Sequence, residues 1–152
     1  MAERLHLLPK LRQRVLTVPL ELGRPLWVED PDFDLANHVR VDVLDAPGDR
    51  AALEALADRS NMELLDRRRP LWELRFVIGL DDGNVAMIEK VHHAMVDGVA
   101  GVDLASILLD AERDVAAVPP PTWCPAPLPD VATVVSEGLR EGIRQPLDAV
   151  RW

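Results

Sequence analysis

The alternation of apolar and polar side chains predicts strands at residues 38–44 and 72–80. The first stretch, His38-Val39-Arg40-Val41-Asp42-Val43-Leu44, alternates strictly, which is the period of a half-buried strand. Residues 15–20 alternate more loosely and predict a third, shorter strand. In the stretch 72–80 one side is apolar and the other charged: Trp72, Leu74, Phe76 and Ile78 against Glu73 and Arg75.

Two stretches have the spacing of a helix. Pro47-Gly48-Asp49 ends the strand at 38–44, and Asp49 can cap a helix over residues 50–62. The apolar side chains of that helix fall on one face at Leu53, Leu56 and Ala57. From Gly98 the apolar residues again recur at helical spacing, which predicts a second helix ending near Asp110.

A hairpin is predicted after the strand at 72–80. Asp81-Asp82-Gly83-Asn84 is a turn signal, and residues 85–92 then return antiparallel to the preceding strand. Val85-Ala86-Met87-Ile88 is a continuous apolar run, which is typical of a strand covered on both faces. The predicted elements thus include both strands and helices.

Proline marks the next part of the chain. Residues 119–129 read Pro-Pro-Pro-Thr-Trp-Cys-Pro-Ala-Pro-Leu-Pro, which predicts an extended connector. A further helix is expected from Val131 up to Pro146.

Composition narrows the function classes. A formal net charge of −9 and the absence of Tyr argue against a nucleic-acid partner. Cys124 is the one cysteine, so no internal disulfide forms. No apolar stretch approaches the roughly 20 residues of a membrane span, and Pro9 and nearby basic residues interrupt any signal-peptide core. A soluble cytoplasmic protein is expected.

The first fourteen residues are locally basic and rich in leucine. They carry Arg4, Lys10, Arg12 and Arg14 against Glu3. This pattern fits either a surface that touches anionic lipid or a short helix with a solvated basic face, and the second reading is favoured because the charges are few.

The segment His92-His93-Ala94-Met95-Val96-Asp97-Gly98 is the main candidate for chemistry. An imidazole titrates near neutrality, so it can take a proton from an alcohol and pass it on. Neighbouring residues of a strand point to opposite faces. If the strand persists through His92 and His93, one should therefore be the base and the other structural.

Other interpretations of this segment stay open. A histidine beside an apolar strand is often a packed, hydrogen-bonded core residue. Asp97 can bond an imidazole, pair with an arginine or cap the following helix, and Gly98 permits a tight turn. A metal site built from His92, His93 and Asp97 is disfavoured because the two imidazoles would diverge and no ligand cluster completes it. We therefore expect no metal.

The sequence around this segment resembles the bacterial wax ester synthase/diacylglycerol acyltransferases. The resemblance rests on the histidine segment together with Pro70-Leu71-Trp72-Glu73-Leu74. The stretch at 25–34 and the proline-rich connector with Trp123 look like the same family. The His-x-x-x-Asp-Gly core alone is shared with chloramphenicol acetyltransferase-like enzymes and peptide-synthetase condensation domains, and the flanking matches favour the lipid enzymes.

The resemblance implies a fold and a reaction. The fold would be a two-subdomain α/β fold of the chloramphenicol acetyltransferase type, present here incompletely, with a mixed, mainly antiparallel sheet flanked by helices. The reaction would move a fatty acyl group from acyl-CoA to diacylglycerol or a long-chain alcohol, in triacylglycerol or wax ester synthesis. Acyl-CoA would be a substrate, and no cofactor is implied. A peripheral contact with membranes or lipid inclusions stays open.

The resemblance also implies roles for individual residues. His93 would be the base, Asp97 would fix local geometry, and His92 and Gly98 would shape the pocket. Pro70, Leu71 and Trp72 match a motif taken as structural, with a part in substrate binding left open. For Trp72 itself, a place in the core is favoured.

Members of the family are much longer than this chain. The resemblance therefore implies a partial N-terminal acyltransferase subdomain at 1–115, a proline-rich linker at 116–130, and at 131–152 the start of a helix leading to a missing C-terminal subdomain. Two alternatives to an acyl-CoA enzyme remain: a condensation-type acyltransferase using carrier-bound thioesters, and a non-catalytic remnant. Acceptor, acyl length and oligomeric state are not decided by the sequence.

Overall fold

The structure, a computed structural model, describes residues 7–18, 25–96, 122–136 and 140. Two short 3-10 helices, two α-helices and five strands have defined bounds in these ranges: η2 (Pro9–Arg12), β1 (Gln13–Leu16), β2 (Leu26–Glu29), η4 (Leu35–Asn37), β3 (Val39–Val43), α1 (Arg50–Met62), β4 (Trp72–Ile78), β5 (Ala86–Val91) and α2 (His93–Val96). Residues 131–136 are also helical.

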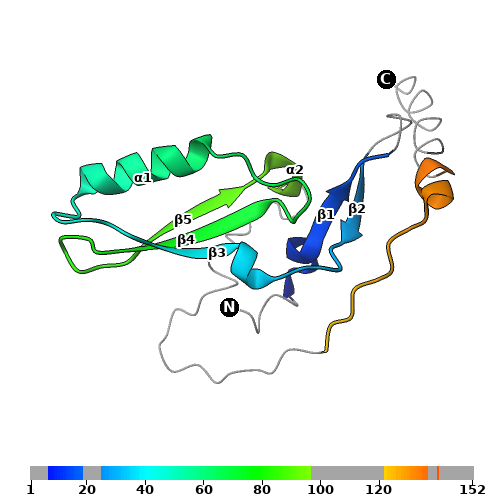
Figure 1. The fold of residues 1–152 in the computed structure, drawn as a ribbon, viewed down its shortest axis with the longest axis horizontal. Helices are drawn as coiled ribbons and strands as arrows, with labels where there is room; N and C mark the ends of the chain where they lie inside the picture. The colour runs from blue at the N-terminus through cyan, green and yellow to red at the C-terminus, as the bar shows by residue number, and fades with distance from the viewer. Residues whose placement is uncertain (1–6, 19–24, 97–121, 137–139, 141–152) are drawn as a thin grey trace, which may run out of the picture.

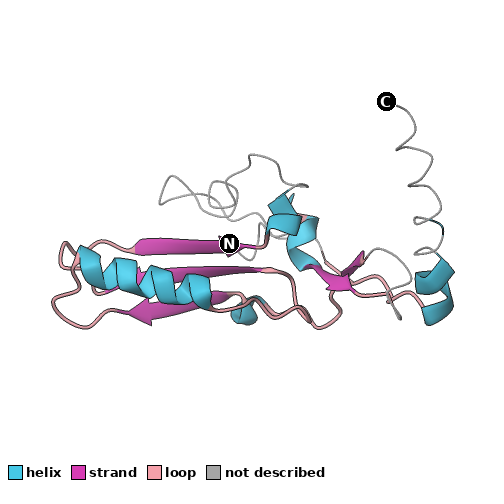
Figure 2. Cartoon of the chain, turned by 90° about the horizontal axis from the view of Figure 1, so that it is seen from above, coloured by secondary structure: helices cyan, strands magenta, loops and turns pink. Residues whose placement is uncertain are grey.

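The described strands form two sheets. The larger has the order β3-β4-β5, in which β3 runs parallel and β5 antiparallel to β4. Helix α1 connects the parallel pair and lies across one face of this sheet (Figures 1 and 2). The β1-β2 hairpin is antiparallel and lies beyond the end of the larger sheet at which β5 leads into α2 (Figure 1).

The strands and helix predicted from the sequence are largely present. The helix at 50–62 is confirmed, and the Asp49 side chain accepts a hydrogen bond from the Ala52 amide at 2.9 Å, as a helix cap does. The strands at 38–44, 72–80 and 85–92 are confirmed with slightly shorter bounds, whereas the strand expected at 15–20 begins earlier and ends at Leu16.

Two expectations need correction or fall outside the described residues. The prediction that β5 is covered on both faces is wrong, because Ala86, Met87 and Ile88 are only partly buried and Val85 is 60% exposed. Its apolar run belongs to a strand with one neighbour among the described strands. The helix predicted from Gly98 to Asp110 lies outside the described residues.

The two faces of the larger sheet differ in chemistry. On the face away from α1, Trp72 and Leu74 join a buried cluster with Leu11, Leu71 and Met95. On the face toward α1, Glu73 and Arg75 are buried although they are charged. The sequence placed these residues on opposite sides correctly, but the burial of the charged side was not foreseen.

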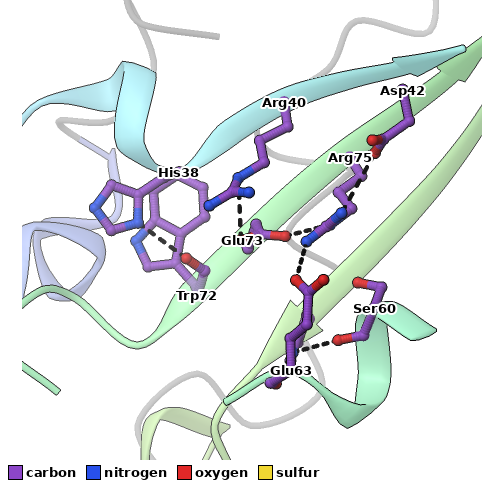
Figure 3. A network of polar contacts seen from close by, with 9 residues as sticks. His38, Arg40, Asp42, Ser60, Glu63, Trp72, Glu73 and Arg75 are labelled. Carbon is purple, nitrogen blue, oxygen red and sulfur yellow. Dashed lines mark hydrogen bonds and ion pairs between the residues drawn. The ribbon is translucent and has the colours of Figure 1, made fainter. Parts of the chain in front are cut away.

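Ion pairs explain how the charged face can be buried (Figure 3). Arg75 donates to Glu73 and, across to the end of α1, to Glu63 at 2.5 Å. Asp42 on β3 lies 3.6 Å from the same guanidinium. Desolvation lowers the pKa of Arg75, but these carboxylates outweigh it, and the pKa is raised overall. The network ties α1 to the middle of the sheet.

The turn before α1 requires glycine. Gly48 has a φ of +66°, and a Cβ atom there would lie 1.9 Å from the carbonyl oxygen of Gly79. The hairpin glycine Gly83 has a similar φ of +72° but has nothing within 4 Å of the same position. Both positions therefore have a backbone conformation that would be strained for alanine, but they differ in crowding.

We predict that Gly48→Ala destabilises the protein more than Gly83→Ala. The second change should cost about 1–2 kcal/mol in free energy of unfolding, the usual penalty of a left-handed backbone for alanine. The first should cost clearly more, since backbone atoms must also move. Urea denaturation of both variants checks this, and equal losses would contradict it.

Candidate active site

The two histidines of the candidate segment lie where β5 ends. The strand stops at Val91, and the backbone N–H of His92 donates to the carbonyl oxygen of Leu71 at 2.9 Å. Helix α2 begins at the next residue, His93. The chain therefore turns at His92, which is hydrogen-bonded to Leu71, the residue before β4.

The His92 ring stabilises this turn. Its Nδ1 accepts a hydrogen bond from the Ala94 amide at 3.1 Å, in the manner of a side-chain cap at the start of a helix. Because Nδ1 accepts, the neutral ring carries its proton on Nε2. Met95 N–H donates to the His92 carbonyl at 2.8 Å, and the Met95 side chain is buried in the core cluster. The turn is thus held by both backbone and side chain.

Two hollows adjoin at this turn. One, of about 480 Å³, is lined largely by apolar groups that include Val15, Trp27 and Leu71. The other, of about 600 Å³, includes both His92 and His93 in its wall. Arg67, Leu71 and His92 line both hollows, so the two spaces meet along these three residues.

Both histidines therefore line one hollow. The expectation that they diverge depended on the strand continuing through them, and the strand ends one residue before His92. His93 is exposed, and its ring has no hydrogen-bond partner among the residues that the structure describes. Asp97 and Gly98 lie outside the described residues, so their predicted roles stay predictions.

The Pro70-Leu71-Trp72 segment contributes unequally to the hollows. Leu71 lines both hollows, and Pro70 lines neither. Trp72 is 1% exposed, and its indole Nε1–H donates to the Leu11 carbonyl at 2.8 Å. The structure thus places Trp72 in the core, next to Leu71, whose carbonyl accepts the hydrogen bond from the His92 N–H.

Two further residues were not singled out from the sequence: Arg67 beside the hollows and His38 beside Trp72. Arg67 lies in the turn over residues 66–69 and lines both hollows, and among the described residues it has no ion-pair partner. Its neighbour Arg68 is instead held by Asp66 at 2.9 Å. These hydrogen bonds lower the pKa of Asp66 to about 2. A run of three arginines in the sequence does not reveal which one faces the histidines.

The second is His38, which is 2% exposed (Figure 3). Its Nδ1–H donates to the Trp72 carbonyl at 2.9 Å, and its ring stacks on the Trp72 ring with centroids 4.6 Å apart. Burial lowers the pKa of His38 below its ordinary 6.5, and the charge of Arg69 acts in the same direction. The hydrogen bond to Trp72 and the carboxylates Asp30 and Glu73 raise the pKa, but by less.

No metal site is found in the described ranges, where no three His, Cys, Asp or Glu side chains gather. None of the helices in those ranges is long and apolar enough to cross a membrane.

Comparison with known proteins decides the family. The model of the wax ester synthase/diacylglycerol acyltransferase catalytic domain matches residues 1–152. The chain belongs to this family. A solved structure, a wax ester synthase/diacylglycerol acyltransferase from Marinobacter aquaeolei VT8, is similar with a TM-score of 0.59 and 37% sequence identity, over 90% of this chain and 32% of that one. This likeness confirms the expected α/β fold of the chloramphenicol acetyltransferase type.

Curated relatives agree with the family. A Mycobacterium tuberculosis protein that carries the name diacylglycerol O-acyltransferase is 45% identical over 139 residues, which is 91% of this chain and 29% of that protein. A second protein of the same name and species is 34% identical over 144 residues, 95% of this chain and 53% of its own length. The chain thus spans between about a third and a half of these relatives.

We predict that Trp72→Phe destabilises the protein by about 1–3 kcal/mol, because the ring remains but the buried Leu11 carbonyl loses its donor. Chemical denaturation measures this, and Trp123→Phe, at a partly buried position without such a bond, is the control. Equal, small losses in both variants would contradict the assignment.

We predict that His38 makes stability depend on pH. The unfolded ring binds a proton as pH falls below 6.5, while the folded ring, with its lowered pKa, resists until lower pH. The wild-type protein should therefore lose free energy of unfolding relative to His38→Asn as pH falls from 7 into this window. Denaturation at several pH values checks this, and parallel curves would contradict it.

Proposed function

We propose that the protein is an acyl-CoA-dependent O-acyltransferase whose acceptor is diacylglycerol or a long-chain alcohol, and that His93 is its catalytic base. The observation that carries the proposal is the position of His93 at the start of α2, two residues after β5, where it is exposed in the wall of a hollow of about 600 Å³. Family membership supports the reaction class.

The proposed reaction follows from the chemistry of an imidazole beside two substrates. His93 removes the proton from the acceptor hydroxyl as the hydroxyl oxygen attacks the thioester carbonyl carbon. The new C–O bond forms and the C–S bond breaks. The imidazolium then returns the proton to the coenzyme A thiolate, so the products are an ester and free coenzyme A. The base is regenerated in each cycle.

The surrounding residues support this assignment of roles. His92 is occupied through Nδ1 by the Ala94 amide, which suits a residue that shapes the turn. The hollow lined by Val15, Trp27 and Leu71 suits an alkyl chain. Asp97 and Gly98 keep the roles that the resemblance implies.

The chemistry of the substrates also bears on location. Coenzyme A esters are water-soluble, whereas diacylglycerol and long-chain alcohols reside in lipid. We propose that the protein acts in the cytoplasm, at the periphery of a membrane or lipid inclusion, and that it needs no cofactor beyond its acyl-CoA substrate.

The test uses the protein expressed from its complete reading frame. With palmitoyl-CoA and either hexadecanol or diolein, we expect release of free coenzyme A together with ester formation. His93→Ala should lower kcat by about 10²- to 10⁴-fold, the usual contribution of a positioned base. His92→Asn, which retains an acceptor atom for the Ala94 amide, should keep most of the activity.

Two results would contradict the proposal. Turnover that survives His93→Ala would remove the assigned base. Preference for an acyl group on a carrier protein over acyl-CoA would point to condensation-type chemistry instead.

A further inference from the structure

The start of β3 lacks one backbone donor. In the parallel pairing of β3 with β4, Leu74 N–H donates to the His38 carbonyl at 2.8 Å. Continuation of this evenly spaced ladder would bring the His38 N–H to the Trp72 carbonyl. That N–H instead donates to Leu35 at 2.9 Å, because His38 ends the 3-10 helix η4. The backbone leaves the Trp72 carbonyl without its ladder partner.

The His38 side chain supplies the missing donor. Its Nδ1 lies 2.9 Å from the Trp72 carbonyl oxygen, and since that oxygen can only accept, Nδ1 carries the proton. The ring is held between Phe33, at a centroid distance of 5.3 Å, and Trp72. Its Nε2 is buried and has no partner among the described residues. Such a ring is suited to the neutral state, in agreement with the direction of its pKa shift.

Trp72, whose carbonyl accepts from His38, is next to Leu71, whose carbonyl holds the turn at His92 and His93. Leu71, immediately before Trp72, receives the backbone N–H of His92. The indole of Trp72 is anchored in turn to Leu11. A shift of the segment 70–72 would therefore move the residue to which the histidine turn is attached.

We propose that His38 is a positioning residue: its Nδ1–H···O=C bond to Trp72 fixes the segment 70–72, and the Leu71 carbonyl of that segment holds His92 and so aims His93. This inference rests on the proposed function for its catalytic consequence only. The link from His38 to the backbone of His92 has a readout of its own.

The experiment compares His38→Asn with His38→Gln in the protein expressed from its complete reading frame. The Asn side-chain nitrogen can occupy the place of Nδ1, whereas the Gln nitrogen lies one carbon further out, where Nε2 stands. Both variants lose the ring and keep an amide. They differ mainly in whether the Trp72 carbonyl keeps its donor.

Two measurements are made on each variant. Amide hydrogen exchange at His92 reports its bond to Leu71, and steady-state kinetics with palmitoyl-CoA report catalysis. For His38→Gln we expect His92 to exchange about tenfold faster and kcat to fall about tenfold with KM little changed. His38→Asn should stay within about twofold of the wild type in both, since it keeps the bond.

Val77→Ala is the control for a general loss of stability. Val77 is fully buried at the far end of β4 and lines neither hollow. It should lower the melting temperature without faster exchange at His92 relative to its neighbours.

The outcomes separate this inference from the proposed function. Equal exchange at His92 in the Asn and Gln variants would overturn the inference, whether or not the enzyme turns over. Faster exchange in the Gln variant alone, in a protein that releases no coenzyme A from palmitoyl-CoA, would support the positioning role and contradict the proposed function.

Discussion

The hydrogen bond from the His92 amide to the Leu71 carbonyl is the contact on which the site depends. It joins the last residue before α2 to the residue before β4. The start of β4 and the end of β5, which are antiparallel, therefore lie side by side at the hollows. A bond of this kind contributes only about 1 kcal/mol to stability. Its importance is geometric, because it determines where the chain leaves the sheet and hence where His93 lies.

The rest of the described structure makes this attachment rigid. On one face of the sheet, Trp72 and Leu74 pack with Met95, the buried residue of α2. On the other face, the Arg75 network and the contacts of Lys90 with the Ser60 and Glu63 carbonyls hold α1 against the strands. Removal of one partner from a buried ion network is costly because the other charges stay desolvated. The sheet therefore holds in place the turn at His92 and His93, whose side chains are exposed.

Local signals in the sequence predict α1, β3, β4 and β5, but β2 and the two 3-10 helices were not predicted. Asp49 and the spacing of Leu53 and Leu56 predict α1, and strict alternation predicts β3, because caps and periodicity are local properties. The place of the histidines at a strand end follows from the apolar run before them. Alternation does not reveal strand direction, so the parallel pairing of β3 with β4 was not foreseen.

What the sequence could not show depends on contacts between distant residues. His38 looked like the first residue of a strand, and its role at Trp72 arises from a 3-10 turn and a parallel ladder that meet there. The strand condition behind the expected divergence of His92 and His93 is not met, because β5 ends at Val91 and α2 begins at His93. The sequence alone does not distinguish Arg67, which lines the hollows, from Arg68, which forms an ion pair with Asp66.

We propose that the His93 ring lies where the acyl donor binds. The most direct measurement is the rate at which diethyl pyrocarbonate modifies His93, resolved from His92 by fragment-ion mass spectrometry, with and without a non-cleavable thioether analogue of palmitoyl-CoA. We expect a saturating analogue to slow modification of His93 at least tenfold, while the rate for free imidazole in the same solution stays unchanged. An unchanged rate at His93 with the analogue fully bound would contradict it.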